Sequence, residues 1–154
     1  MITMDQGGFV SGSQGECYIT IDGRRYNFMS LKKFDAKVEK QKKKFAVLGK
    51  TGKVNKTTGW EGTGNIGYYL NTSIFAKMAL QLKNTGKDVY FEIQVTNEDL
   101  GSDVGKQTVI LKNCNADSID LAKLDPESEA LEGETSITFD DFELPDEFTD
   151  LAGM

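Results

Sequence analysis

Apolar and polar side chains alternate along much of this chain, and this period of two constrains the fold more than any other feature. The alternation is clearest in residues 17–21, 60–70 and 89–95. Successive side chains of a β-strand point to opposite faces, so each run predicts a strand with one buried face. The chain is therefore expected to be mainly β.

An Asp-Gly dipeptide at residues 22–23 follows the first of these runs. This dipeptide favours the two-residue turn of a β-hairpin. Such a turn places Ile19 opposite Tyr26 and Cys17 opposite Phe28, so apolar residues share one face on both strands. A hairpin is the best-supported local prediction in the sequence.

The apolar positions change parity within residues 31–48, from even numbers around Phe34 to odd numbers at Phe45 and Val47. A strand cannot change parity without a bulge, bend or loop. The change falls within the lysine-rich residues 39–44. We expect a long hairpin arm or a strongly bent strand over 31–48, followed by a glycine-punctuated loop over 49–59.

The next expected strand, residues 60–70, carries Gly62 and Gly64 on its apolar face. Glycines inside a strand indicate close backbone approach or strong curvature. After this strand one helix is expected, capped by Asn71 or Thr72 and ended by Gly86. Its core-facing stripe is expected to consist of Ile74, Phe75, Met78, Ala79 and Leu82.

Two later strands repeat the parity change, one between Ala116 and Ile119 and the other at residues 140–141. Bulges supply the curvature that closes a barrel. The fold class is therefore expected to be an antiparallel β-sandwich or barrel with one packed helix. At 154 residues the chain is expected to form a single domain, with a loosely attached acidic end at residues 145–154.

The net charge of −6 conceals a strong separation of charge along the chain. Residues 24–56 carry +10, whereas residues 98–154 carry −13. Two interpretations stay open at this point. The opposed charges neutralise one another within the molecule and aid solubility, or they are complementary between copies.

The composition argues against most catalytic and metal sites. The chain has no histidine, which removes the commonest general acid/base and the commonest metal ligand. Cys17 and Cys114 are too far apart for a zinc-binding Cys-x-x-Cys pair and are expected to be small buried residues. We expect no enzyme activity, cofactor or metal. No apolar run of about 20 residues predicts a membrane anchor, so a cytoplasmic protein is expected.

Two motifs have an alternative interpretation. Residues 62–67 match the dinucleotide fingerprint G-x-G-x-x-G, but a hydrophilic loop precedes them and strand-like residues follow, so strand glycines are the better interpretation. Lysines near Phe34, Phe45 and Trp60 also suit a single-stranded nucleic-acid-binding β-barrel. The alternating spacing of these aromatics is typical of a core, and this barrel is kept as an alternative of another class.

Five runs in combination resemble the tail tube proteins of contractile phage tails. They are TGWEGTG at 58–64, TGKDVYFEIQ at 85–94, VGKQTV at 104–109, the stretch 125–131 and FDDF at 139–142. The similarity covers residues 11–148, nearly the whole chain. It is greatest to the branch found in defective prophages and R-type bacteriocins of Gram-positive bacteria. Tubes of type VI secretion systems or of non-contractile tails are the related alternatives.

The resemblance implies a structural protein that assembles through inter-subunit β-sheets. Hexameric rings would stack into a hollow tube inside a contractile sheath, with the hairpin arm bridging rings. The implied partners are other copies, the sheath, baseplate and tail-terminator proteins, and DNA as transient cargo in a phage. A wall that passes DNA is expected to be acidic or uncharged. The chain would be made in the bacterial cytoplasm and incorporated into a virion tail or tail-like particle.

Two sets of charged residues are the candidate assembly sites. The ring-stacking set comprises Lys37, Lys40, Lys42, Lys43, Lys44, Lys50 and Lys53. The acidic set, a candidate partner surface in the next ring or on the sheath, comprises Asp140, Asp141, Glu143, Asp146 and Glu147.

Overall fold

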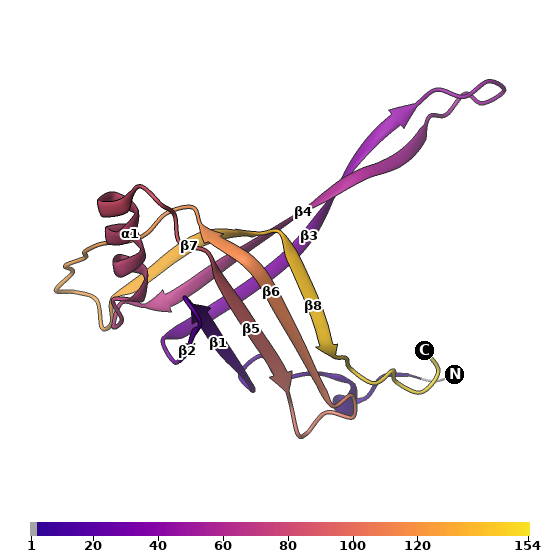
Figure 1. Cartoon of the computed structure of the whole chain (residues 1–154). Helices are drawn as coiled ribbons and strands as arrows, with labels where there is room; N and C mark the ends of the chain where they lie inside the picture. The colour runs from indigo at the N-terminus through magenta and orange to yellow at the C-terminus, as the bar shows by residue number, and fades with distance from the viewer. Residues whose placement is uncertain (1–2) are drawn as a thin grey trace.

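The computed structural model describes residues 3–154 and consists of strands, one α-helix and a short 3-10 helix (Figure 1). The elements in chain order are η1 (Gln6–Gly8), β1 (Gly15–Ile21), β2 (Arg24–Asn27), β3 (Leu31–Phe45), β4 (Val54–Tyr69), α1 (Ile74–Thr85), β5 (Phe91–Glu98), β6 (Lys106–Ala116), β7 (Glu132–Phe139) and β8 (Asp141–Asp146).

All strand pairings are antiparallel, in the order β2-β1-β5-β6-β7-β4-β3, and β8 pairs with β6. β6 joins two halves of this sheet, because most of it pairs with β5 and β8 while Asn115 and Ala116 pair with β7. In Figure 1 the group β1, β5, β6 and β8 crosses the direction of β3, β4 and β7. The expected fold class, antiparallel β with one packed helix, is confirmed.

The predicted hairpin of β1 and β2 is confirmed in register. Ile19 lies opposite Tyr26. The turn residues 22–23 have φ values of 51° and 78°, the left-handed conformation that an Asp-Gly turn requires. The Phe28 N–H donates to the carbonyl of Cys17 at 2.8 Å.

α1 closes one end of the molecule over an aromatic cluster. Phe75 is 2% exposed, and its ring centroid lies 5.8 Å from that of Phe28, 4.9 Å from Tyr68 and 6.4 Å from Phe91. Leu82 was expected in the core but is exposed, because only the first half of the helix covers the cluster.

The ends of α1 agree with the sequence only in part. Gly86 stops the helix in the left-handed conformation, with φ 71°, as predicted. The N-cap residue is Ser73 rather than Asn71 or Thr72. The hydroxyl of Thr72 still accepts a hydrogen bond from the Ile74 N–H at 3.4 Å, so it satisfies one of the free donors of the first turn.

Of the two parity changes predicted in the later strands, the first lies at another position and the second is confirmed. In β6 the change comes at a bulge, since two residues, Lys112 and Asn113, face the single residue between Phe91 and Ile93 of β5. Asn113 has a φ of 54°. The predicted position after Ala116 is wrong because β6 ends there. The second switch is confirmed at residue 140, where the chain passes directly from β7 to β8.

Gly62 and Gly64 lie where the backbone of β4 is closely approached, as the sequence predicts. A Cβ atom at Gly62 would overlap the Phe139 ring, and one at Gly64 would lie 2.6 Å from the carbonyl oxygen of Asp35. The glycines therefore admit the neighbouring side chain and strand, and residues 62–67 form part of a strand rather than a nucleotide-binding turn.

Substituting Gly62 by alanine should lower the free energy of unfolding by about 1–3 kcal/mol, because Phe139 must move to make room for the methyl group. Gly59→Ala is the matched control in the same strand, since its Cβ would meet only the mobile end of Gln41 at 3.3 Å. Urea unfolding of the monomers would measure both. Equal midpoints for the two variants would contradict the assignment of Gly62 as a packing requirement.

Both cysteines are buried and free, as expected. Desolvation raises the pKa of Cys17 and of Cys114 to about 12, so neither thiol is reactive at neutral pH. Within residues 3–154, no cluster of three or more His, Cys, Asp or Glu side chains is suited to holding a metal ion. No helix in the same range has the length and apolar character needed to cross a membrane.

Candidate assembly surfaces

The hairpin of β3 and β4 extends well beyond the body of the molecule (Figure 1). β4 pairs with β7 only from Gly62 onward, so residues 40–60 have no other strand beside them in the described chain. We call residues 40–60 the arm. β4 begins at Val54, so the turn of the hairpin spans residues 46–53 and is shorter than the loop expected at 49–59.

A bulge twists the arm near the position that the parity change predicts. Gln41 lies opposite Gly59 and Lys42 opposite Thr57, which leaves Thr58 without a partner. The Thr58 hydroxyl donates to the Gln41 carbonyl at 3.2 Å. The extra residue therefore belongs to β4, and β3 passes through its lysine-rich run without interruption.

Aromatic contacts fix the arm to the body. The ring centroid of Trp60 lies 5.7 Å from that of Phe142, edge to face, and 6.5 Å from that of Phe139. Phe139 ends β7, and Phe142 lies near the start of β8. The base of the arm is thus packed where the chain passes from one half of the sheet to the other, which sets the direction of the arm.

The arm carries seven lysines and no acidic residue. Lys43 lies directly opposite Lys56, and like charges in that position destabilise a strand pair. Lys40, Lys42, Lys43, Lys44, Lys50 and Lys53, six members of the ring-stacking set, lie on the arm and form no ion pair with any residue of 3–154. Their positive charge is therefore not neutralised by an ion pair within residues 3–154.

Lys37, the seventh member of that set, lies on β3 before the arm begins at residue 40. It pairs with Glu39 at 2.9 Å, and this contact raises the pKa of Lys37. The structure therefore separates Lys37 from the other six.

The turn of the arm exposes apolar side chains. We call residues 45–54 the tip, and it exposes Phe45, Val47, Leu48 and Val54, with Leu48 fully exposed at 101%. Figure 1 shows the turn between β3 and β4 projecting away from the other labelled elements. Apolar groups gathered on a projecting loop mark a contact surface.

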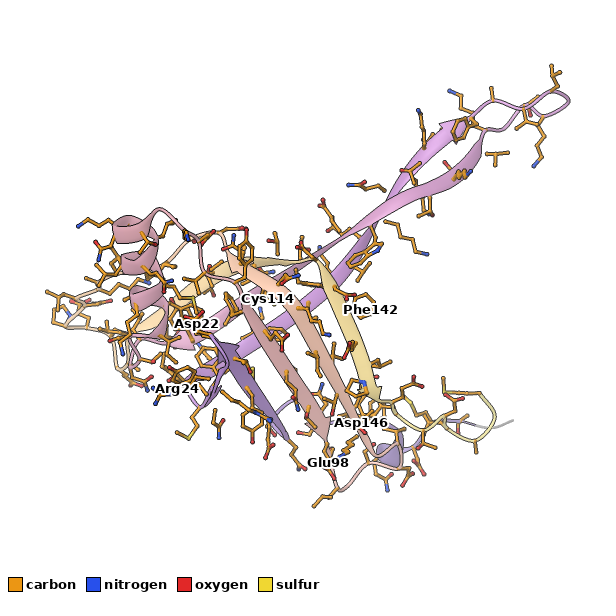
Figure 2. All side chains as sticks on the ribbon, viewed as in Figure 1. Asp22, Arg24, Glu98, Cys114, Phe142 and Asp146 are labelled. Carbon is orange, nitrogen blue, oxygen red and sulfur yellow. The ribbon has the colours of Figure 1, made fainter. Side chains whose placement is uncertain are left out.

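The acidic set of residues 140–147 lies along β8 and its flanks, and two of its members already have partners. Glu143 pairs with Lys112 at 2.7 Å, which raises the pKa of that lysine. Asp146 accepts from the Thr108 hydroxyl at 2.9 Å and lies 3.9 Å from Lys106. Figure 2 shows Phe142 and Asp146 near the two ends of this strand. Asp140, Asp141 and Glu147 form no ion pair within residues 3–154.

A second acidic surface, which the sequence patterns did not single out, lies at the end of β4 remote from the tip. A hollow of about 750 Å³ is lined there by Tyr69, Leu131 and Glu132 and by residues 123–125 and 128–130. Residues 117–132 carry six acids against Lys123. Leu121 and Leu124 are exposed beside these acids. The signal in the sequence that could have indicated this surface is the presence of leucines within an acidic stretch that has no strand pattern.

Three strands have one free edge. Among the described residues, β2 pairs only with β1, β3 only with β4, and β8 only with β6. Unpaired backbone groups along a strand are ready to pair with another chain. The edge of β3 is the longest, at 15 residues.

Comparisons with known proteins agree with a tube-forming fold. The phage tail tube protein family matches residues 2–146. The chain is 37% identical to the phage-like element PBSX protein XkdM of Bacillus subtilis over 141 residues, which cover 92% of this chain and 93% of that one. It is also 37% identical to YqbM of the same bacterium over 138 residues, covering 90% and 91%.

Solved structures share the fold at low sequence identity. The chain aligns with a component of the sheath-tube complex of an extracellular contractile injection system, PVC, with a TM-score of 0.64, 7% identity and coverage of 88% of this chain and 90% of that one. A component of the anti-feeding prophage baseplate gives a TM-score of 0.60, 10% identity and coverage of 94% and 97%. With a family model and a relative that each span nearly its whole length, the chain belongs to the phage tail tube protein family.

Proposed function

We propose that this chain is the subunit of the inner tube of a contractile tail or tail-like particle, and that six copies form each ring of a stacked, hollow tube. The observation that carries the proposal is the arm, which projects an exposed apolar tip and seven lysines that form no ion pair within residues 3–154. Because an exposed surface of this kind is costly for a monomer, it favours contacts between copies. The relative in a phage-like element of Bacillus supports the assignment to a particle of this class.

The free edges of β2, β3 and β8 support closure of each ring through inter-subunit β-sheets. A closed ring satisfies edge strands that a single copy leaves unpaired. In this scheme the arm lysines contribute to ring stacking, and the acidic residues of β8 contact the next ring or the sheath. The remaining partners are baseplate and terminator proteins, and DNA where the particle carries a genome. The role is structural, with no catalytic step, and assembly takes place in the bacterial cytoplasm.

Electron microscopy of the concentrated protein tests the proposal. We expect rings and tubes with a central channel, and sixfold symmetry in averaged end views. A protein that stays monomeric at every concentration would contradict tube assembly. Rings of another symmetry would contradict the hexamer alone.

A further inference from the structure

We propose that the tip of the arm of one copy seats in the hollow at the end of β4 of a copy in the next ring, so that rings stack head to tail. This inference rests on the proposed function and names the surface that receives the arm. The hollow is the one lined by Tyr69, Leu131, Glu132 and residues 123–125 and 128–130.

The tip and the hollow lie at opposite ends of the same pair of strands. Phe45 pairs with Val54 at the tip, and Leu31 pairs with Tyr68 at the other end. The next residue, Tyr69, pairs with Glu132 in the wall of the hollow. A strand of 16 residues spans roughly 50 Å. Figure 1 shows the turn of the hairpin at one end and the end of β4 at the other. A displacement of that order along the hairpin would bring the tip of one copy to the hollow of another.

The two surfaces match in charge. The arm carries seven lysines and no acid, whereas residues 117–132 carry six acids and one lysine. That lysine, Lys123, donates to the backbone carbonyl of Glu132 at 2.8 Å, and Lys32 pairs with the Glu132 side chain at 2.6 Å. Asp125 and Glu129 line the hollow and form no ion pair within residues 3–154. They are free to meet Lys50 and Lys53 of another tip.

The two surfaces also match in apolar character. Leu48 at the tip is 101% exposed, and Leu124 at the hollow is 98% exposed. Each leucine alone is an ordinary surface residue, but neither stands alone. Phe45, Val47 and Val54 are also exposed at the tip, and Leu121 is exposed near Leu124. Contact between the two surfaces would remove apolar area from water, which contributes about 25 cal/mol for each Å² buried.

The acidic set on β8 is a weaker receiver for the arm. Glu143 and Asp146 are engaged with Lys112, Lys106 and Thr108 of their own chain. The start of β8 also packs against Trp60 at the base of the arm rather than lying at the far end of the hairpin. The hollow is therefore the receiver. Asp140, Asp141 and Glu147, which form no ion pair within residues 3–154, stay available for the sheath.

Head-to-tail contact accounts for growth into a tube. Two different surfaces of the chain meet, so each ring keeps one set of tips and one set of hollows free for the next ring. Contacts of this heterologous kind build open filaments instead of closed dimers. Several arms act together in every ring, so weak individual contacts add to a strong one.

Disulfide cross-linking between introduced cysteines tests the contact. The double variant Leu48→Cys, Leu124→Cys, assembled into tubes and oxidised with copper–phenanthroline, should give a ladder of dimers, trimers and longer multimers on a non-reducing gel. Residues 48 and 124 lie at opposite ends of the β3–β4 hairpin, so cysteines introduced there cannot join within one monomer. The native thiols of Cys17 and Cys114 are buried and do not compete.

The controls separate the possible contacts. The single variants Leu48→Cys and Leu124→Cys should give no ladder, and dimers from Leu48→Cys alone would indicate tip-to-tip contact and overturn the inference. The pair Leu48→Cys, Leu144→Cys tests β8 as the receiver, and a ladder from this pair alone would also overturn it. Tubes without any ladder from Leu48→Cys, Leu124→Cys would refute the inference and leave the proposed function standing. Failure of the unaltered chain to form tubes would instead refute the proposed function.

Discussion

The triple variant Lys42→Glu, Lys43→Glu, Lys44→Glu is expected to form no tubes while remaining a folded monomer. These three lysines are consecutive on β3, project from the body and have no ion-pair partner in residues 3–154. Three reversed charges on each arm would face an acidic partner surface, and like charges brought together at an interface cost several kcal/mol. Negative-stain micrographs of concentrated protein would show the loss of tubes.

The folded state of this variant should be unchanged. In the unaltered chain Lys43 lies opposite Lys56, and Lys43→Glu replaces that repulsion by an attraction. The control Lys42→Arg, Lys43→Arg, Lys44→Arg keeps the charge and should form normal tubes. Circular dichroism would confirm that both variants are folded. Normal tubes from the glutamate variant would show that the arm lysines do not contribute to stacking.

The variant Phe75→Ala is expected to lose about 3–5 kcal/mol of the free energy of unfolding, the range for removing a fully buried aromatic ring. Phe75 is 2% exposed and contacts the rings of Phe28, Tyr68 and Phe91. Phe75 and Met78 are the two buried residues of α1, so the helix should loosen together with the core when Phe75 is removed. Urea unfolding of the monomer would measure the loss.

Phe45→Ala is the matched control for this substitution. Phe45 is the same residue type but lies exposed on the tip, where its removal creates no cavity. Its unfolding midpoint should stay close to that of the unaltered chain. Equal losses for Phe75→Ala and Phe45→Ala would contradict the placement of Phe75 in the core.

The local sequence was sufficient to predict the elements whose cause is local. The hairpin of β1 and β2 has the predicted register because an Asp-Gly turn and the alternation of residues 17–28 both act over a few residues. The stop of α1 at Gly86 depends only on the conformational freedom of glycine. Leu82 was misplaced because helical periodicity shows which face is apolar, not how far the core beneath it extends.

Elements that depend on a distant strand were predicted less well. The parity change near residue 41 was correctly located, but its extra residue, Thr58, belongs to the partner strand. The bulge of β6 lies at Asn113 because β5 leaves one residue facing two there. A sequence pattern records that the face changes, and only the pairing of two strands decides which strand carries the additional residue.

The two candidate sites show the same limit. The run of lysines and the acidic C-terminal third were visible in the sequence as opposed charges. Which acids of β8 are free was not visible, because Glu143 and Asp146 find partners on β6 through strand pairing. Lys37 instead pairs with Glu39 of its own strand. The hollow beside Tyr69 was also hidden, since it joins residues 123–132 to the end of a strand more than fifty positions earlier.

By itself, the sequence determined that this protein is an antiparallel β fold with one helix, separated charges and the motifs of a tail tube protein. These properties follow from side-chain periodicity, turn chemistry and composition, which act along the chain. The tertiary structure decided between a projecting arm and a bent strand for the lysine-rich residues, and it alone showed that a hollow lies at the other end of the same strands. The physical reason is that projection and concavity depend on where neighbouring strands end, and those ends are set by contacts between segments far apart in sequence.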